Sequence, residues 1–447
     1  MRDLFITANI LLTFPVIFMR PYVGITMWCW LSYMNPHRLT WGWAYSMPFA
    51  LGVAAITIVG FVISREPKRF PLNAMSVLIV MITIWVSITT VFAIVPDQAA
   101  VKWDRTIKIL AMTFVTMVLV TNRERLQALI WIIVISLGFY GVKGGIFAIL
   151  TAGNYRVWGP ANTFIGDNNQ LAFSLLVVMP LMRYLQVTTE NIWIRRALGI
   201  SMVLTGLAVF ASYSRGALLA ATVMALMLLL RARRKLMIVM GLVVVLSVGV
   251  AFAPEQWIER MNTLETYEED GSAMGRFDAW KFAFEVAKRN PIFGGGFLVQ
   301  FEHELFMEYV PEAVKPRAFH SIYFEVLGEH GFIGLGLFTI LGLVSAYNCR
   351  WIRARTKYRT ELRWAHELST MIFLSLVGYA VGGAFLNMAF YDLFYHLLTI
   401  VMVAKILVHQ NLTNTIKAKV QTPAPVPGAT PALPAYQARN DFLVSNR

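Results

Sequence analysis

His320 combines a residue type and a position that suit proton transfer at a membrane surface. It precedes Ser321, where a long charged segment meets an apolar stretch of the chain. An imidazole with its unperturbed pKa of about 6.5 is mostly neutral near pH 7 and can accept a proton from a hydroxyl. The alternative is a histidine that starts a helix and only hydrogen-bonds a loop carbonyl, and position alone favours that alternative. His320 is therefore a candidate general base.

Two arginines are candidates for binding an anion. Arg215 lies between two apolar runs, and its planar guanidinium matches the oxygens of a phosphate. Arg276 lies near the start of an expected amphipathic helix, where backbone N–H groups also favour anions. Each has an ordinary alternative. A boundary arginine commonly extends to the lipid headgroups, and Arg276 could be the solvated partner of a nearby carboxylate.

A second group of titratable residues follows the candidate base. Glu325, Glu329 and His330 are predicted on the same helix, with His330 nearly three turns deeper at about 1.5 Å per residue. Ionisable groups at that depth are costly and tend to face a cavity. They could line an acceptor cavity or relay a proton, or they could form a buried structural network, and the sequence favours neither. Asp392 and His396 raise the same question.

The segment Tyr155–Gln170 is rich in aromatic and amide side chains, which suit the rings and hydroxyls of sugars. Trp158 and Asn168 are candidates for contact with a glycan, although loop composition alone explains the segment nearly as well. Further cations with weaker claims are Arg317, Arg156 and Lys102.

The chain as a whole predicts an all-α, polytopic integral membrane protein. Its 447 residues are 57% hydrophobic and only 14% charged, with a mean hydropathy of +0.59, whereas soluble domains are about 25% charged. A span needs about 20 apolar residues to cross about 30 Å of hydrocarbon. Such runs predict about a dozen helices, over residues 4–34, 44–63, 72–95, 106–120, 126–150, 169–187, 197–213, 216–230, 235–253, 321–347, 368–388 and 390–408.

The distribution of charge predicts the orientation of these helices. With the N-terminus inside and twelve crossings, the basic loops all fall on one side, which the positive-inside rule makes the cytoplasm. These loops lie around residues 65–69, 123–125, 195–196, 231–235 and 350–363. The formal charge of +14 therefore mainly reflects orientation, and no nucleic-acid partner is expected. Pro15, Arg20 and Pro21 interrupt the run 4–34, which is too long for one straight span, so it is a kinked helix or a tight hairpin.

The longest outer segment, residues 254–320, carries twelve acidic residues against seven Lys and Arg. Apolar spacing predicts helices over Met274–Arg289 and Glu302–Tyr309, with a flexible turn at Gly294–Gly296 between them. The Pro-rich residues 417–447 predict a disordered cytoplasmic tail. Cys29 and Cys349 indicate neither a disulfide nor a zinc site, and no other metal site stands out.

Several of these residues occur in the order found in one enzyme superfamily. The matching positions are Arg215 with Leu219, Gly275 and Arg276 with Trp280 and Pro291–Gly296, and His320-Ser321 with Gly331-Phe332-Ile333-Gly334. Over roughly residues 160–400 the chain resembles the O-antigen ligase and polymerase superfamily. Its N-terminal part, with Arg20-Pro21-Tyr22 and residues 28–37, is similar to a subgroup labelled O-glycosylation ligases that is associated with the exosortase system.

The resemblance implies a type C glycosyltransferase architecture, with residues 1–416 as the transmembrane ligase domain. It implies a bacterial inner-membrane enzyme whose active site faces the periplasm. The donor would be a glycan on undecaprenyl diphosphate, the acceptor the lipid A core oligosaccharide, and the reaction a metal-independent, inverting displacement without a cofactor. His320 would be the general base, and Arg215 and Arg276 would bind the diphosphate. The other cavity or acceptor contacts would be Glu325, Glu329, His330, Arg317, Trp158 and Asn168.

Two other readings remain open. Within the same superfamily, an O-antigen polymerase or a protein O-oligosaccharyltransferase would use the same machinery on a different acceptor, which the sequence does not specify. A transporter of lipid-linked glycans would also need charges within the membrane and arginines at its outer face. No inverted repeat is apparent, and a large outer loop ending in a histidine motif is unusual for a transporter.

Overall fold

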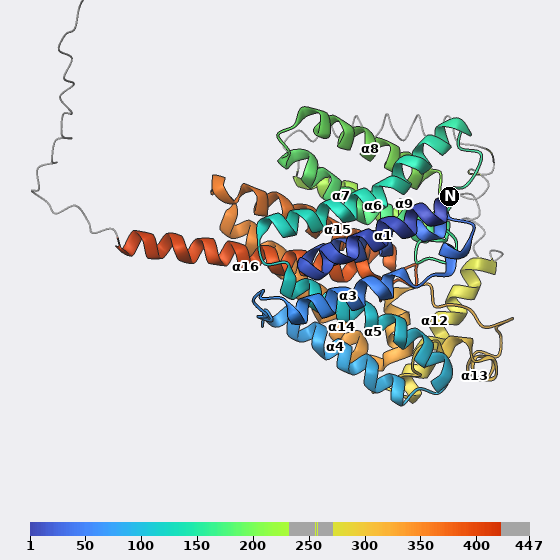
Figure 1. Cartoon of the computed structure of the whole chain (residues 1–447). Helices are drawn as coiled ribbons and strands as arrows, with labels where there is room; N and C mark the ends of the chain where they lie inside the picture. The colour runs from blue at the N-terminus through green and yellow to red at the C-terminus, as the bar shows by residue number, and fades with distance from the viewer. Residues whose placement is uncertain (232–254, 256, 258–270, 422–447) are drawn as a thin grey trace, which may run out of the picture. The chain divides into compact units, whose positions relative to one another are not determined.

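The computed structural model describes residues 1–231, 255, 257 and 271–421, and this part of the chain is helical. Apolar runs become helices because a helix satisfies its own backbone hydrogen bonds in lipid. Four helices form the N-terminal part (Figure 1): α1 (Arg2–Met19), α2 (Pro21–Tyr33), α3 (Phe49–Ile63) and α4 (Ala74–Val91). Five follow: α5 (Pro96–Leu119), α6 (Arg123–Leu150), α7 (Asn168–Thr188), α8 (Ile192–Phe210) and α9 (Arg215–Arg231). After residue 270 come α12 (Gly271–Arg289), α13 (His303–Tyr309), α14 (Ile322–Thr356), α15 (Arg363–Gly383) and α16 (Asp392–Gln421).

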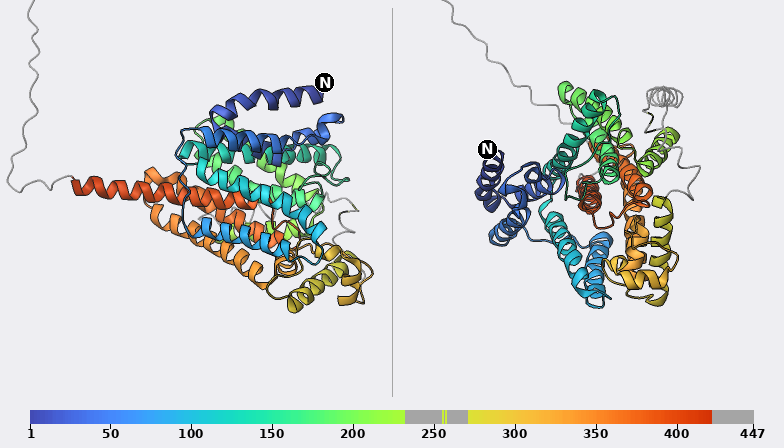
Figure 2. Two further views of the ribbon diagram at one scale, coloured as in Figure 1. Left: turned by 60° about the horizontal axis from the view of Figure 1, so that its bottom comes forward. Right: turned by 90° about the vertical axis from the view of Figure 1, so that its right-hand side faces the viewer.

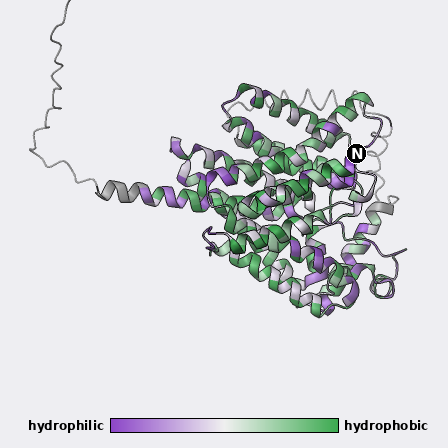
Figure 3. Cartoon of the chain, viewed as in Figure 1, coloured by the Kyte–Doolittle hydropathy of each residue, from purple (hydrophilic) through white to green (hydrophobic). Residues whose placement is uncertain are grey.

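Among the described residues, seven helices are long and apolar enough to cross a membrane. They are α1, α4, α6, α7, α8, α14 and the part of α16 up to Asn414. Apolar residues dominate these helices (Figure 3), as expected of a polytopic membrane protein. The predicted helix at 235–253 and most of the segment 254–270 lie outside the described residues.

The first apolar run forms a hairpin of two helices. Pro21 lies in the first turn of α2 and follows the break at Arg20. A proline is well tolerated there because the first N–H groups of a helix have no hydrogen-bond partner within the helix. Asp3 lies near the start of α1. Its Oδ1 accepts a hydrogen bond of 3.0 Å from the N–H of Ala44, which belongs to the loop after α2. The chain therefore starts at the same end as the loop after α2. The sequence predicted an N-terminus at the same end as the basic loops. The structure corrects this prediction, because the run counted as one crossing forms two antiparallel helices.

One end of the helices gathers the loops that precede α3, α7 and α9, and we call it the His320 end (Figures 1 and 2). The Asn162 Nδ2 donates to the Tyr45 hydroxyl at 2.9 Å. The Tyr213 hydroxyl donates to the Gly153 carbonyl at 2.6 Å. The first bond joins the loop after α2 to the loop after α6. The second bond joins the loop after α6 to the turn before α9.

The basic loops meet at the opposite end. The Arg125 guanidinium binds both carboxylate oxygens of Glu66, at 2.6 and 3.0 Å, which joins the loops before α4 and α6. The Arg123 guanidinium lies over the Trp364 ring, 5.2 Å from its centre, which joins the starts of α6 and α15. Separation of these basic residues from the His320 end agrees with the charge asymmetry that the sequence shows.

The outer segment between α9 and α14 has a small core of its own. The helix predicted over Met274–Arg289 is confirmed as α12, and the one predicted at Glu302–Tyr309 is confirmed as α13. Their apolar faces bury Phe282, Phe306 and Phe319 completely. The rings of Phe282 and Phe306 stack with centres 4.5 Å apart. This core fixes the chain up to the residue before His320.

A backbone break at Gly331 interrupts α14, where φ is 68° and ψ is −170°. The glycine turn Gly294–Gly296 fills the break. The N–H groups of Gly295 and Gly296 donate to the carbonyls of Gly328 and Glu329 at 2.8 and 2.9 Å, and the Phe332 N–H donates to the Pro291 carbonyl at 3.0 Å. A side chain at Gly331 would place its Cβ 2.3 Å from the Ile292 carbonyl oxygen. The turn predicted as flexible is thus held by backbone hydrogen bonds.

The helix α16 continues to Gln421, past residue 417, where the tail was predicted to begin. Contacts divide the chain into two units, Met1–Val408 and His409–Arg447. The predicted disorder of the tail concerns residues 422–447, which lie outside the described part of the chain.

Candidate active site

Arg215 and Arg276 line the same pocket at the His320 end. Asn169, Ser214, Gly216, Phe385 and Leu386 complete its wall, and its volume is about 20 Å³. The two arginines come from different helices, α9 and α12, so only the tertiary fold brings them together. A pocket of this size holds about one water molecule. Two guanidinium groups at one pocket are suited to an anion that carries more than one charge.

The turn before α9 determines where Arg215 lies. Tyr213 adopts a left-handed backbone with φ of 60°, a conformation that is uncommon for residues other than glycine. The Ser214 hydroxyl then caps α9 by accepting from the Ala217 N–H at 3.3 Å. Asn168 holds the same turn, because its Nδ2 donates to the Ser212 carbonyl at 2.7 Å. The start of α7 therefore positions the start of α9.

Trp280 connects Arg276 to His320. It lies one turn after Arg276 on α12, so both side chains occupy one face of the helix. The indole Nε1 donates a hydrogen bond of 2.7 Å to the carbonyl of Phe319. Its ring also stacks on Phe324 of α14, with centres 5.0 Å apart. This one side chain fixes the residue before His320 against the helix that carries Arg276.

His320 is half-buried and has a left-handed backbone, with φ of 46°. Histidine tolerates this region better than most residues, and such strain is concentrated at functional sites. Burial lowers the pKa of His320, the charge of Arg276 lowers it further, and Arg317 adds a smaller effect in the same direction. The carboxylate of Asp167 opposes them. The imidazole is therefore neutral near pH 7, the state that a general base requires.

Arg317 also belongs to this cluster. A Cβ added at Gly275 would lie 2.5 Å from the Arg317 Cδ, so the side chain of Arg317 passes directly over the glycine that precedes Arg276. Any larger residue at Gly275 would displace Arg317. The glycine of the Gly275-Arg276 motif thus leaves the space that the Arg317 side chain occupies.

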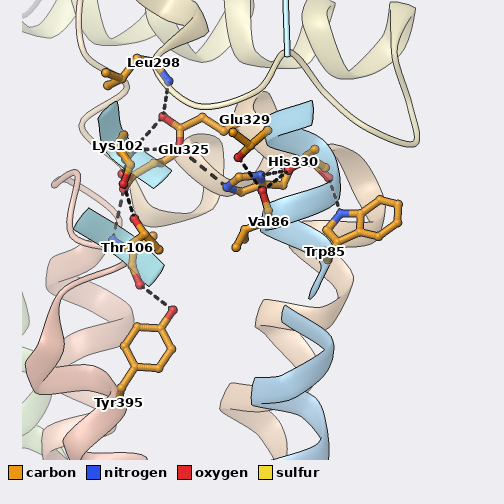
Figure 4. A network of polar contacts seen from close by, with 12 residues as sticks. Trp85, Val86, Lys102, Thr106, Leu298, Glu325, Glu329, His330 and Tyr395 are labelled. Carbon is orange, nitrogen blue, oxygen red and sulfur yellow. Dashed lines mark hydrogen bonds and ion pairs between the residues drawn. The ribbon is translucent and has the colours of Figure 1, made fainter. Parts of the chain in front are cut away.

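Glu325 and Glu329 are buried and share one cation (Figure 4). The Lys102 ammonium lies 2.7 Å from Glu325 Oε1 and 2.7 Å from Glu329 Oε1. Each carboxylate also accepts a backbone hydrogen bond, Glu329 from the Leu298 N–H and Glu325 from the Ala389 N–H, both at 3.1 Å. These partners occupy the oxygens that an acceptor sugar would use. Of the two readings left open by the sequence, the geometry favours a structural network.

His330 lies at the break in α14 and faces α4. Its Nδ1 is 2.7 Å from the Thr89 hydroxyl, and its carbonyl accepts from the Trp85 indole at 3.0 Å (Figure 4). Phe297 and Phe390 contact the imidazole edge-on, with ring centres at 4.5 and 5.5 Å. The side chain is only 1% exposed. Residues 322–330 form one helical stretch of α14, so His330 lies deeper along this helix than His320, as the spacing predicted, and the break follows it at Gly331.

The buried network of Lys102, Glu325 and Glu329 holds one wall of the pocket lined by Arg215 and Arg276, the arginine pocket. Glu325 binds the Ala389 N–H in the connection between α15 and α16. Phe385 and Leu386, four and three residues earlier in that connection, line the pocket. The Tyr379 hydroxyl donates to the Met388 carbonyl at 2.7 Å and holds the connection from the other side. Glu325 is thus placed to position one wall of the pocket.

The other predicted residues lie either near the start of α7 or beside α2. Trp158 is 57% exposed in the loop after α6, whereas Asn168 is 3% exposed and uses its amide inside the protein. Asp392 and His396 lie away from the arginine pocket among residues of α2. The Ser32 hydroxyl donates to Asp392 Oδ2 at 2.5 Å, and the Tyr33 hydroxyl lies 2.5 Å from His396 Nδ1.

Sequence reasoning assigned little or no role to three residues that shape this site. Asp167 caps α7 by accepting from the Asn169 N–H at 2.8 Å, and its charge acts on His320. An Asp before an apolar run is a capping signal, but it does not reveal the distant histidine. Lys102 was given a weak claim because its carboxylate partners are far along the chain. Trp280 was recognised only as part of a motif, and its bond to Phe319 has no sequence signal.

Two family models match the chain, and they divide it near residue 195. Residues 1–190 match a family of unknown function (DUF5935). Residues 200–339 match the family described as O-Antigen ligase. No curated protein matches the chain significantly. The protein therefore contains a domain of the O-antigen ligase family, a family of glycan-transferring enzymes.

The matched range includes the residues of the site. Arg215, Arg276 and His320 all lie between residues 200 and 339. The connection between α15 and α16, which supplies Phe385 and Leu386, lies after this range. Asp167 and Lys102 lie in the N-terminal family. The site is thus assembled from both matched regions and from the helices that follow them.

Proposed function

We propose that the protein is an O-antigen ligase that transfers a glycan from undecaprenyl diphosphate to the lipid A core oligosaccharide. The observation that supports this most is the meeting of Arg215 and Arg276 at one pocket, with the charge of Arg276 acting on His320. An anion site beside a neutral imidazole matches the two requirements of the reaction. The leaving diphosphate needs positive charge, and the attacking hydroxyl needs a base.

The reaction can be written with every bond accounted for. A hydroxyl oxygen of the acceptor attacks the anomeric carbon of the donor sugar and forms the new glycosidic bond. The bond between that carbon and the diphosphate oxygen breaks, and its electron pair leaves with undecaprenyl diphosphate. His320 takes the hydroxyl proton. Attack opposite the leaving group inverts the anomeric configuration.

Each arginine has a distinct place in this scheme. Arg215 and Arg276 bind the diphosphate and stabilise the charge that grows on it as the bond breaks. The pocket is too small for a diphosphate as it stands, so the two side chains move apart when the donor binds. Positive charge from two arginines serves the purpose of a divalent cation in other displacements of this kind. The proposed reaction therefore needs no metal.

The membrane orientation follows from the positive-inside rule. The basic loops at residues 65–69 and 123–125 lie opposite the His320 end and are placed in the cytoplasm. The His320 end, with residues 254–320 and the N-terminus, is then periplasmic in a bacterial inner membrane. About a dozen helices in a type C glycosyltransferase arrangement cross the membrane. Trp158 and Arg317, at the periplasmic end, are the proposed contacts for acceptor or glycan.

The acceptor is tested with a panel. Purified protein receives labelled undecaprenyl-diphosphate-linked glycan together with lipid A core, a Ser/Thr peptide, or unlabelled lipid-linked glycan. Transfer to lipid A core alone supports the ligase. Transfer to the peptide or to the second lipid-linked glycan supports a protein O-oligosaccharyltransferase or an O-antigen polymerase instead. Movement of the donor across liposomes without transfer to any acceptor supports a transporter.

A further inference from the structure

A groove of about 550 Å³ opens between α6 and α8, away from the arginine pocket. Its lining is apolar apart from Lys143 and Ser201, and includes Trp131, Phe139 and Met182. None of its lining residues belongs to α9 or α12, the helices of Arg215 and Arg276. Pockets that hold small ligands have volumes of about 300–1,000 Å³. The groove is therefore large enough for a ligand and distinct from the proposed active site.

Glycines explain why the two helices leave a groove of this form. A Cβ at Gly145 would lie 2.2 Å from the Leu204 carbonyl oxygen, and one at Gly141 would lie 2.2 Å from the Thr205 hydroxyl oxygen. The backbones of α6 and α8 therefore touch near the His320 end. Gly138, toward the other end of α6, lines the groove beside Met182. The groove lies where glycine leaves a gap beside the helix contact.

Lys143 is unusual in this setting. It is the only charged residue in α6 after Arg125, it is exposed, and α6 is apolar enough to span a membrane. Among the described residues, none forms a hydrogen bond or an ion pair with its ammonium group. An ionisable side chain within a span is costly and is retained where it has a partner or a function. Seven residues separate it from Leu150, so it lies about 10 Å below the helix end.

We propose that the groove binds an anionic phospholipid, with one acyl chain in the groove and its phosphate at Lys143. A lysine at this depth extends toward the headgroup region while its stem stays in the hydrocarbon. The apolar lining suits a chain, and the ammonium suits a negative headgroup. Basic positions between membrane helices recognise anionic lipids in this way. The site is independent of the proposed transfer reaction.

Binding of lipid to the full-length protein tests the proposal. The purified, delipidated protein is titrated with phosphatidylglycerol or phosphatidylcholine of the same chain length, and bound lipid is counted by native mass spectrometry. We expect phosphatidylglycerol to bind preferentially. Lys143→Gln should weaken its binding about fivefold, from the contribution of about one basic residue near the surface. Lys143→Arg should keep the preference, and Ser201→Phe, which fills the groove, should weaken binding of both lipids.

Lys281→Gln, which removes an exposed lysine of the outer segment, is the matched control and should change nothing. Equal binding of the two lipids would overturn the proposal and leave an unselective apolar groove. So would unchanged binding by Lys143→Gln or loss of the preference in Lys143→Arg. Displacement of phosphatidylglycerol by an equal concentration of undecaprenyl phosphate would also overturn it and assign the groove to a prenyl chain. The melting temperature of each variant shows that it is folded.

Discussion

The Trp280 indole donates a hydrogen bond of 2.7 Å to the carbonyl of Phe319, the residue before His320. Trp280 lies on the same helix face as Arg276, one turn away. The proposed base and one of the two arginines proposed to bind the diphosphate are therefore held by a single short connection between α12 and the start of α14.

Trp280→Phe tests that connection. The variant keeps the ring that stacks on Phe324 but removes the hydrogen bond, so we expect kcat to fall about tenfold or more, because misplacement of a catalytic group is costly. The KM for the donor should change little. Steady-state kinetics of glycan transfer measure both. Trp103→Phe is the control, because it removes an indole hydrogen bond to Ser87 elsewhere. Equal losses in the two variants would contradict the connection.

Asp167 and Arg317 predict opposite changes in the pH dependence of transfer. Burial and nearby arginines lower the pKa of His320, whereas Asp167 raises it. Activity falls as the base is protonated, so the acid limb of kcat/KM follows this pKa. Asp167→Asn should move the limb to lower pH, and Arg317→Gln should move it to higher pH. Asp104→Asn, at an exposed pair with Lys108, is the control. Shifts in one common direction would exclude this electrostatic account.

Lysine should not replace arginine in the pocket. Arg215→Lys and Arg276→Lys keep the charge but lose the planar fork that matches a diphosphate. A charge-assisted hydrogen bond contributes about 1.5–3 kcal/mol, so kcat/KM should fall about 10- to 100-fold. Arg289→Lys, at an exposed pair with Glu308, is the control on the same helix as Arg276. Full activity of both pocket variants would show that a diffuse positive charge is sufficient.

The buried lysine network predicts a difference in stability. Lys102→Met leaves Glu325 and Glu329 buried without their cation, and loss of one partner from a buried pair costs about 3–5 kcal/mol. Lys281→Met breaks an exposed pair with Glu312, which costs about 0–1 kcal/mol. The melting temperature in detergent should therefore fall much more for Lys102→Met. If both changes lower the melting temperature equally, the contacts of Lys102 with Glu325 and Glu329 do not stabilise the wall of the pocket.

Local features of this fold follow from the sequence, whereas long-range ones do not. Met274–Arg289 was predicted as a helix because its apolar residues recur at helical spacing, and α12 matches it. The pairing of Lys102 with Glu329 joins α5 to α14 across 227 positions of sequence, and no pattern in either helix reveals it. The interlock of Gly331 with Gly294–Gly296 likewise needs two distant segments. A glycine at each position indicates close approach but not its partner.

For the candidate site, too, the sequence predicted individual residues but not the long-range contacts between them. His320 and Arg215 were identified by residue type, boundary position and motif, whereas position alone favoured their ordinary alternatives. Arg276 and Arg215 line one pocket only because the tertiary fold brings α12 near the start of α9. The hairpin of α1 and α2 was left open because a proline permits either a kink or a turn. Asp3, bound to the Ala44 N–H, decides between them.

Single-turnover transfer by the wild type and by His320→Gln tests the central claim most directly. Labelled undecaprenyl-diphosphate-linked glycan and lipid A core are mixed with each protein in EDTA, and donor binding is measured in parallel. The account predicts transfer by the wild type and at least a 100-fold slower rate for the variant, in line with the usual contribution of general-base catalysis of about 10²–10⁴. Donor affinity should be unchanged. Transfer at the wild-type rate by His320→Gln, or a wild type that transfers only after a divalent cation is restored, would contradict it.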